Sequence, residues 1–389
     1  MNSFLTPPNS ISTKTMDRKR FLGIAAGAVL IAGSAYYLTS DTSNLVRDDI
    51  NPGEIEKFPL KADEEAILFL ASLAPSGHNT QPWFIKYVQP YHWLICNDRG
   101  RWLPGVDPQQ RETILSIGAF VQNLEYAAHH LGYYCKFTML AATNQDENIL
   151  NVILTKTGNT AQYDIQKIKL RRTIRSEYLV DALSKEDLAY LINGQTDFLH
   201  FVPNTAKEYK LINEQTIEAN RQQAYRNAAQ AELATWIRFT SKDTERYRDG
   251  LTLAGMEIEG LTAWYLRNFY DKTDVMKSAF RQQSIDQVKR QVSQSAGWLL
   301  ISSKGSSVNQ LLETGMRMQR LFVDVRGRNI AIHPMTQILE ETNNKQSINQ
   351  ITGISDTVQF VLRTGYVKNY PQPVSLRRPV DWFIRPNTT

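Results

Sequence analysis

A ten-residue segment, 74–83, places several hydrogen-bonding side chains between an apolar helical stretch and a strand-like stretch. It reads Ala-Pro-Ser-Gly-His-Asn-Thr-Gln-Pro-Trp. Amide and hydroxyl groups of this kind can bind the polar edge of a flat heteroaromatic ring, while proline and tryptophan supply apolar surface. The candidate contacts are Ser76, His78, Asn79 and Gln81. The alternative is a proline-bounded turn from helix to strand, with Ser76 as a cap.

Two arginine-rich segments in the second half of the chain could bind an anion. Their candidate contacts are Arg171, Arg172, Thr173, Arg175, Arg377 and Arg378. A planar guanidinium group binds phosphate through two parallel hydrogen bonds, and the Thr173 hydroxyl adds a further donor. Arg171 and Arg175 would share one face if their segment were helical. Either cluster could instead be a solvated surface.

Segment 74–83 closely resembles the flavin-contacting segment of the nitroreductase superfamily, which has the form small-Pro-Ser-x-x-Asn-x-Gln-Pro-Trp. The additional His78 and the two basic segments resemble one branch of that superfamily, the single-chain, internally duplicated FMN proteins of the Acg type. The resemblance covers residues 60–385 and implies FMN as the cofactor.

The same resemblance implies roles for the basic segments and for a third segment, 331–337. The first basic segment resembles the start of a nitroreductase subunit, which holds the FMN phosphate and ribityl chain. The second resembles the C-terminal segment that closes on the same phosphate. Segment 331–337 resembles the part of the family whose backbone faces the flavin ring near N5, which adds His333, Pro334 and Met335 as candidate cofactor contacts. His333 could donate to the flavin or substrate, or be a structural histidine.

The chain also repeats a helical pattern that is followed by a strand. Gly118 and Gln122 in the first copy correspond to Gly315 and Gln319 in the second, and a small residue at that position allows close helix packing. A duplicated α+β unit would leave such a trace. Ordinary nitroreductases are homodimers with flavin at the subunit interface. The resemblance therefore implies an α+β, nitroreductase-like fold in which two diverged halves, residues 61–165 and residues 166–385, form a pseudo-dimer within a monomer.

Residues 206–292 interrupt the second half with an almost wholly helical pattern. The large apolar residues along it are Trp236, Phe239, Tyr247, Met256, Trp264, Tyr265 and Phe269. One interpretation is helix packing between the two halves. The resemblance implies another, a lid over the flavin whose aromatic residues exclude water and large substrates.

The first forty residues have the pattern of an export signal or a membrane anchor. Arg18, Lys19 and Arg20 precede residues 21–38, which carry no charge and just reach the length needed to span a bilayer. The segment resembles a twin-arginine signal with Lys19 in place of the second arginine, and that route exports folded, cofactor-loaded proteins. The alternative is a buried N-terminal helix. Residues 41–60 are polar and are predicted to be a linker. We expect an exported protein, periplasmic or anchored to the inner membrane, with the export machinery as a partner.

Composition excludes several other classes. The 389 residues are 42% hydrophobic and 21% charged, with a net charge of +5 and no dense Lys/Arg run, so nucleic acid is not an expected partner. Two cysteines exclude a Cys-rich metal site or disulfide scaffold, and no metal is expected. The chain has no Gly-x-Gly-x-x-Gly turn and no Gly-x-Ser-x-Gly elbow, which argues against a Rossmann domain and a serine hydrolase.

These observations lead to two hypotheses for function. The first is an FMN-dependent oxidoreductase of the nitroreductase type, in which hydride passes through flavin N5 and no catalytic side chain is required. Its partners would be a small-molecule electron acceptor and NAD(P)H as a candidate donor. The second is a flavin-binding or flavin-storage protein whose lid blocks the site and leaves little nitroreductase activity. The motif sets complement each other once, so both hypotheses place one FMN in each chain.

Overall fold

The computed structural model describes residues 40–41, 45–47, 60–158, 163–341 and 348–387. The chain divides into two compact units, 1–43 and 44–389, and the helices and strands below belong to the second. The predicted targeting segment, 1–40, lies outside the described residues except for Ser40, as does most of the predicted linker. Within the described ranges, no helix combines the length and apolarity needed to cross a membrane.

The first half of this unit is built on a five-stranded sheet. Its strands follow the order β11-β1-β2-β4-β3. Their bounds are β1 Trp83–Gln89, β2 His92–Asn97, β3 Tyr133–Met139, β4 Asn148–Lys156 and β11 Ile384–Pro386. β1 to β4 pair antiparallel, whereas β11, from the C-terminal end of the chain, joins β1 in parallel. Helices α2 (Ala62–Ser72) and α3 (Arg111–His130) complete this half.

A second sheet has four antiparallel strands in the order β5-β8-β10-β9. Their bounds are β5 Leu199–Pro203, β8 Gly297–Ser303, β9 Ile330–Pro334 and β10 Thr357–Tyr366. Apart from β11, the strands of each sheet, numbered along the chain within that sheet, are neighbours in the order first, second, fourth, third. In both, one long helix connects the second strand to the third, α3 in the first half and α11 (Val308–Asp324) in the second. The predicted mixed α+β class is thus confirmed.

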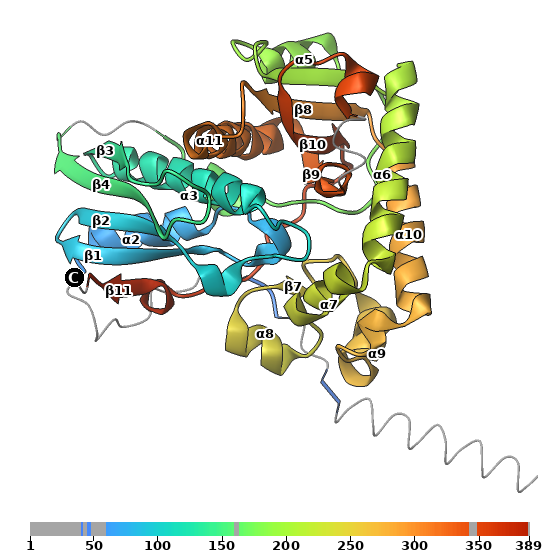
Figure 1. Cartoon of the computed structure of the whole chain (residues 1–389), viewed down its shortest axis with the longest axis horizontal. Coiled ribbons are helices and arrows are strands. Elements are labelled where there is room, and N and C mark those ends of the chain that lie inside the picture. The colour runs from blue at the N-terminus through green and yellow to red at the C-terminus, as the bar shows by residue number, and fades with distance from the viewer. Residues whose placement is uncertain (1–39, 42–44, 48–59, 159–162, 342–347, 388–389) are drawn as a thin grey trace, which may run out of the picture. The chain divides into compact units, whose positions relative to one another are not determined.

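The two halves meet through α3 and α11, which pack on each other (Figure 1). A Cβ added to Gly118 would lie 2.1 Å from the Leu312 carbonyl oxygen, and one added to Gly315 would lie 2.0 Å from that of Leu115. Each glycine therefore faces the carbonyl three residues before the other glycine, and the helix backbones touch. One hydrophobic core continues from β1 and β2 through both helices into β8, β9 and β10.

The insertion predicted at 206–292 lies between β5 and β8, where the first half has only the short turn between β1 and β2. Its elements are α6 Lys207–Tyr225, α7 Asn227–Trp236, β6 Ile237–Arg238, α8 Ser241–Tyr247, β7 Leu251–Thr252, α9 Gly260–Phe269, η3 Asp274–Met276 and α10 Ser278–Ser293. Helices α6 and α10 run side by side (Figure 1). α7, α9 and their connections have a separate small core around Phe239 and Leu253.

Shorter elements complete the unit: η1 Gly77–Asn79, η2 Arg99–Arg101, α4 Gln166–Leu170, α5 Lys185–Ile192, η4 Val325–Arg328, α12 Gln337–Glu340 and η5 Val380–Trp382. Helix α4 ends at Leu170, and Arg171 is extended, with φ −59° and ψ 131°. Residues 171–175 are therefore not helical, and Arg171 and Arg175 do not share a helical face. Cys96 and Cys135 are free, buried thiols.

Candidate functional site

Segment 74–83 leaves α2 as an irregular turn with an unusual backbone. Three of its non-glycine residues have positive φ: His78 at 47°, Asn79 at 55° and Gln81 at 53°. Such conformations are rare for residues with a Cβ and persist where surrounding contacts hold them. Ser76 supplies one such contact, because its Oγ accepts a hydrogen bond from the Gln81 amide at 2.9 Å. The hydroxyl thus bridges the turn internally and caps no helix.

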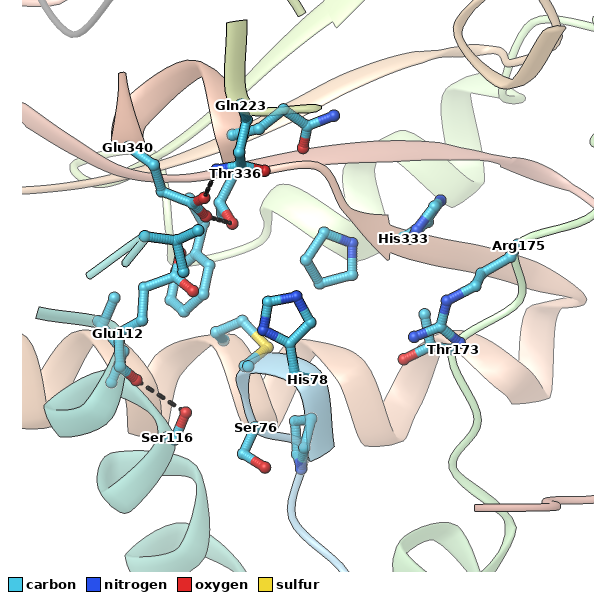
Figure 2. Close-up of a pocket in the computed structure, with 18 residues that line it drawn as sticks. Ser76, His78, Glu112, Ser116, Thr173, Arg175, Gln223, His333, Thr336 and Glu340 are labelled. Atoms are coloured by element: carbon cyan, nitrogen blue, oxygen red, sulfur yellow. Dashed lines mark hydrogen bonds between the residues drawn. The ribbon is translucent and has the colours of Figure 1, made fainter. Parts of the chain in front are cut away.

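Two neighbouring cavities border this turn. The larger, of about 230 Å³, is lined by residues of α3, α11, α12, β9 and the turn, together with Thr173 and Arg175 (Figure 2). The smaller, of about 50 Å³, lies against the basic segments. Pro75, Ser76, Thr173 and Arg175 line both cavities, so the two adjoin along a shared wall.

The smaller cavity is rich in buried guanidinium groups. Arg171, Arg172, Arg175 and Arg377 line it together with Asn79. Nε and Nη1 of Arg171 and Nε of Arg172 are buried and make no hydrogen bond within the described residues. Burial, and then the charge of Arg47, lower the pKa of Arg171 to about 9. Buried donors without acceptors are costly, so an anion such as a phosphate group fits this cavity.

Arg377 is held rigidly at the edge of the same cavity. Its Nε donates to the Ser72 carbonyl at 2.8 Å, and its Nη1 donates to Oδ1 of Asn79 at 2.8 Å. Burial lowers the pKa of Arg377 well below its usual value, and the nearby charge of Arg171 adds to the shift. The C-terminal basic segment and segment 74–83 therefore build one wall together.

Arg47 also lines the smaller cavity, although it is absent from the contacts predicted by sequence. Its backbone amide donates to the Val374 carbonyl at 3.1 Å, and its guanidinium donates to the Lys169 carbonyl. The residue lies in the predicted linker, where a single arginine among polar residues has no spacing or motif that could identify it.

The larger cavity carries two imidazoles, His78 and His333 (Figure 2). Burial lowers the pKa of His78 to about 4, against the opposing effect of Glu112. Burial also lowers the pKa of His333 well below 6.5, and Arg363 and Arg175 add to the shift. Both imidazoles are thus neutral near pH 7, and Nδ1 of each is buried without a hydrogen-bond partner among the described residues.

Two carboxyl groups with no counterpart in the predicted site, Glu112 and Glu340, line the same cavity. Glu112 pairs with the Arg111 guanidinium at 3.0 Å. Burial, and then the charge of Glu112, raise the pKa of Glu340 to about 8. These residues come from α3 and α12, which are distant in sequence, so no local motif could have revealed them.

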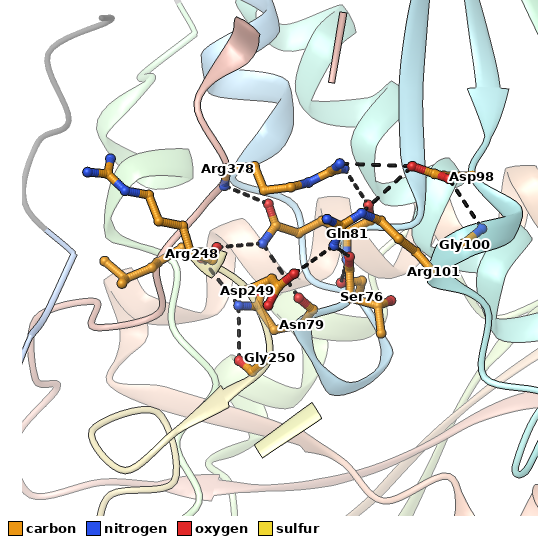
Figure 3. A network of polar contacts seen from close by, with 12 residues as sticks. Ser76, Asn79, Gln81, Asp98, Gly100, Arg101, Arg248, Asp249, Gly250 and Arg378 are labelled. Carbon is orange, nitrogen blue, oxygen red and sulfur yellow. Dashed lines mark hydrogen bonds and ion pairs between the residues drawn. The ribbon is translucent and has the colours of Figure 1, made fainter. Parts of the chain in front are cut away.

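Three predicted contacts, Gln81, Arg378 and Met335, line neither cavity. Gln81 Oε1 accepts from the Arg378 amide at 2.9 Å (Figure 3). Nη2 of Arg378 donates to the carbonyls of Gln81 and Trp83, each at 2.7 Å. Met335 is buried in the core beside the second sheet. These residues therefore make buried contacts that support the segments lining the cavities.

Residues 248–257 of the insertion form hydrogen bonds and an ion pair with the segments around the site. Asn79 Nδ2 donates to the Gly250 carbonyl at 3.2 Å, and Asp249 pairs with Arg101 at 2.8 Å (Figure 3). On the other wall, Glu257 accepts from the Arg175 amide at 3.1 Å. Gly250, Leu251 and Gly255 line the smaller cavity, and Gln223 lines the larger. The aromatic residues expected of a lid do not line either cavity within the described chain.

Comparison with known proteins gives relatives of low identity and long coverage. No family model matches the chain. It is 21% identical over 315 residues to "Probable NAD(P)H nitroreductase PigM" of a Serratia species, covering 76% of this chain and 86% of that protein. It is 22% identical over 323 residues to "Putative NAD(P)H nitroreductase acg" of Mycobacterium tuberculosis, covering 80% and 92%.

Among solved structures, "a putative nitroreductase" from Anabaena variabilis is similar to 85% of this chain and 95% of its own, at 10% identity and a TM-score of 0.34. A TM-score this low supports no argument about fold or function, so the sequence relatives are the informative comparison. Over three quarters or more of its length, this chain is therefore similar to bacterial proteins named as nitroreductases, which supports the superfamily resemblance predicted from its motifs.

Proposed function

We propose that this protein is an FMN-dependent oxidoreductase of the nitroreductase type. The observation that carries the proposal is the pair of adjoining cavities, one walled by buried arginines with unpartnered nitrogens and the other by neutral imidazoles and apolar side chains among the described residues. A phosphate fits the first and a flat ring system fits the second. The relatives named as NAD(P)H nitroreductases suggest NAD(P)H as the electron donor.

The residues that would hold the cofactor follow from the two linings. Arg171 and Arg172 would bind the phosphate, with Arg47 as a further contact. Arg377, whose donors are taken by Asn79 and backbone carbonyls, would add its charge at the edge of the cavity. Thr173 and Arg175, which border both cavities, would bind the chain that links phosphate to ring. The ring would lie against residues of the larger cavity, among them Ser76, His78, His333 and Pro334. FMN, when bound, supplies hydride transfer through N5, while the protein supplies binding and orientation.

The arrangement of the two halves supports a pseudo-dimer with one site. Apart from β11, both sheets have the same strand order, and the α3–α11 contact is reciprocal at Gly118 and Gly315. The turn at 74–83 comes from the first half and Arg171 to Arg175 come from the second, and each occurs once. A monomer would thus carry one FMN at the interface between its halves.

We further propose that residues 1–40 export the domain or anchor it to the inner membrane. The support is the sequence pattern, Arg18 to Arg20 followed by eighteen uncharged residues. A reporter fused after Thr389 should then report an exported location. Replacing Arg18 and Lys19 with Gln should keep it in the cytoplasm, and an unchanged location would count against the proposal.

A second candidate function is flavin binding or storage with restricted access. It is favoured by the contacts of residues 248–257, which tie the insertion to both walls of the smaller cavity. Such contacts could exclude bulky substrates.

One set of measurements separates the candidates. Flavin released from purified protein should be FMN, near one per chain, and anaerobic NADPH should bleach the flavin absorbance. Bound FMN that NADPH reduces and a nitroaromatic reoxidises supports the oxidoreductase. Bound FMN that neither reagent reaches supports storage. A protein purified without flavin that binds none when FMN is added would refute both.

A further inference from the structure

The larger cavity has two chemically different ends. Thr173 and Arg175 lie at the end shared with the smaller, basic cavity, and Glu112 and Glu340 lie at the opposite side (Figure 2). His78 lies between them, whereas His333 lies on the side of Arg175 (Figure 2), and Nδ1 of each imidazole is buried with no partner among the described residues. An unpartnered buried nitrogen facing a cavity points to a ligand there.

Glu340 differs from the carboxyl groups around it. Its two oxygens accept hydrogen bonds from Thr336 Oγ1 at 3.0 Å and from Gln223 Nε2. Within the described chain it forms no ion pair, whereas its neighbour Glu341 pairs with Arg226 at 2.6 Å and Glu112 pairs with Arg111 at 3.0 Å. A carboxyl group that is enclosed beside another carboxylate and lacks a cation favours its protonated form.

The charged and titratable groups facing Glu340 come from several elements. α3 contributes Glu112 and Arg111, and Asp107 precedes that helix and accepts its first amides. His78, from the turn, lines the same cavity, and Arg226, which follows α6, pairs with Glu341. Burial is the largest cause of the raised pKa of Glu340, followed by the charge of Glu112. The hydrogen bonds from Gln223 and Thr336, and then the charge of Arg111, oppose the shift without cancelling it. Glu340 is therefore largely protonated at neutral pH.

Resting on the proposed function, we propose that Glu340 is the proton donor to an electron acceptor bound in the larger cavity. The acceptor class is a neutral quinone, whose carbonyl oxygen becomes a hydroxyl on reduction. A quinone that gains one hydride receives two electrons and one proton, and needs one more proton to become a hydroquinone. The O–H bond of Glu340 breaks, its electron pair stays on the carboxylate, and a new O–H bond forms on the acceptor. Solvent then reprotonates Glu340.

The other polar groups of the cavity are poorer donors. The pKa of His78 is about 4, so its imidazolium form is scarce near pH 7, and neutral imidazole is a weak acid. The pKa of His333 is shifted in the same direction. Glu112 is engaged by Arg111. Among the described residues that line this cavity, Glu340 is the group whose proton is both present and transferable near neutral pH.

The test compares two acceptors in the flavin-loaded protein. Ferricyanide takes electrons without a proton, whereas p-benzoquinone requires one. In Glu340→Gln, stopped-flow reoxidation of NADPH-reduced protein by p-benzoquinone should slow by about a hundredfold or more, the range for loss of a general acid. Reoxidation by ferricyanide should stay as in the wild type. The wild-type rate with p-benzoquinone should fall as the pH rises through about 8, the pKa of Glu340. Glu186→Gln, which changes an exposed carboxyl that lines neither cavity, is the control and should alter neither rate.

An infrared measurement tests the protonation state without turnover. Cofactor-free wild type at pH 7 should show the carbonyl band of a protonated carboxyl, and this band should be absent in Glu340→Gln. As the pH is raised, the band should be lost at a lower pH in Glu112→Gln than in the wild type, because the charge of Glu112 raises the pKa of Glu340. Equal slowing with both acceptors, or a missing band, would overturn the assignment of Glu340. A wild type that binds no FMN or is not reduced by NADPH would instead overturn the proposed function, and the donor role with it.

Discussion

The chemistry of the smaller cavity depends on buried arginines with nitrogens that have no hydrogen-bond partner in the described part of the chain. Replacing Arg171 with Ala should weaken FMN binding by about 1.5–3 kcal/mol, the usual contribution of a charged hydrogen bond. Riboflavin, which lacks the phosphate, should lose much less. Fluorescence titration with both ligands measures the difference. The matched control is Arg221→Ala, which removes an exposed arginine paired with Glu218. Equal losses for the two ligands would mean that Arg171 acts on folding.

Arg378 should behave differently, although it is the sequence neighbour of Arg377. Its guanidinium donates to the carbonyls of Gln81 and Trp83 and lines neither cavity. We expect Arg378→Ala to weaken FMN and riboflavin alike and to lower the free energy of unfolding, because buried carbonyls lose their donor. A loss confined to FMN, in the same titrations, would place Arg378 at the phosphate after all.

Burial of the His78 imidazole should make the free energy of unfolding depend on pH. Burial lowers its pKa from 6.5 to about 4, so the unfolded chain binds more protons than the folded one between those values. The free energy of unfolding therefore falls as the pH drops through this window, by at most about 3 kcal/mol, and is unaffected above it. His78→Gln should remove this part of the pH dependence. Urea unfolding of both proteins at pH 7 and pH 5 is the measurement, and identical pH dependence would contradict it.

The close contact between α3 and α11 should make the stability of the protein sensitive to the size of the residues at 118 and 315. A Cβ at Gly118 or Gly315 would meet a backbone carbonyl at 2.1 Å or 2.0 Å, and backbone cannot move aside as a flexible side chain can. Alanine at either position should lower the free energy of unfolding by about 1–3 kcal/mol, although alanine usually stabilises a helix. Gly327→Ala is the control, since nothing lies within 4 Å of its added Cβ among the described residues. If urea unfolding showed that Gly118→Ala is as stable as the wild type, the close contact between α3 and α11 would be refuted.

Local patterns predicted the elements better than they predicted the walls of the site. Apolar periodicity and the paired glycines indicated the helical insertion and the repeated helix–strand units, because both are properties of adjacent residues. Segment 74–83 was recognised, but the positive φ at His78, Asn79 and Gln81 decides which side chains face the cavity, and Gln81 turns toward Arg378. Glu112, Glu340 and Arg47 reach the cavities only through tertiary packing, which no local pattern encodes.

At the scale of the whole molecule, one site depends on segments from nearly the full length of the second unit. Arg47, the turn at 74–83, Arg171 and Arg377 converge on the smaller cavity, and β11 returns to pair with β1 of the first half. A single core runs through both sheets. The halves should therefore unfold together with loss of flavin, since neither contains a complete set of cavity walls.

The boundary between the two units should also be the boundary of the flavin-binding part of the chain. A chain beginning at Asn44 retains the whole second unit, including Arg47, so it should fold and bind FMN as the full chain does. A chain beginning at Leu60 lacks Arg47 and should bind FMN about 1.5–3 kcal/mol more weakly, with riboflavin less affected. Arg47→Ala in the full chain should reproduce that loss, which separates the side chain from the truncation. If the chain from Asn44 folded but bound no FMN, residues 1–43 would belong to the flavin site, and the division of the chain into a targeting segment and an independent flavin domain would be wrong.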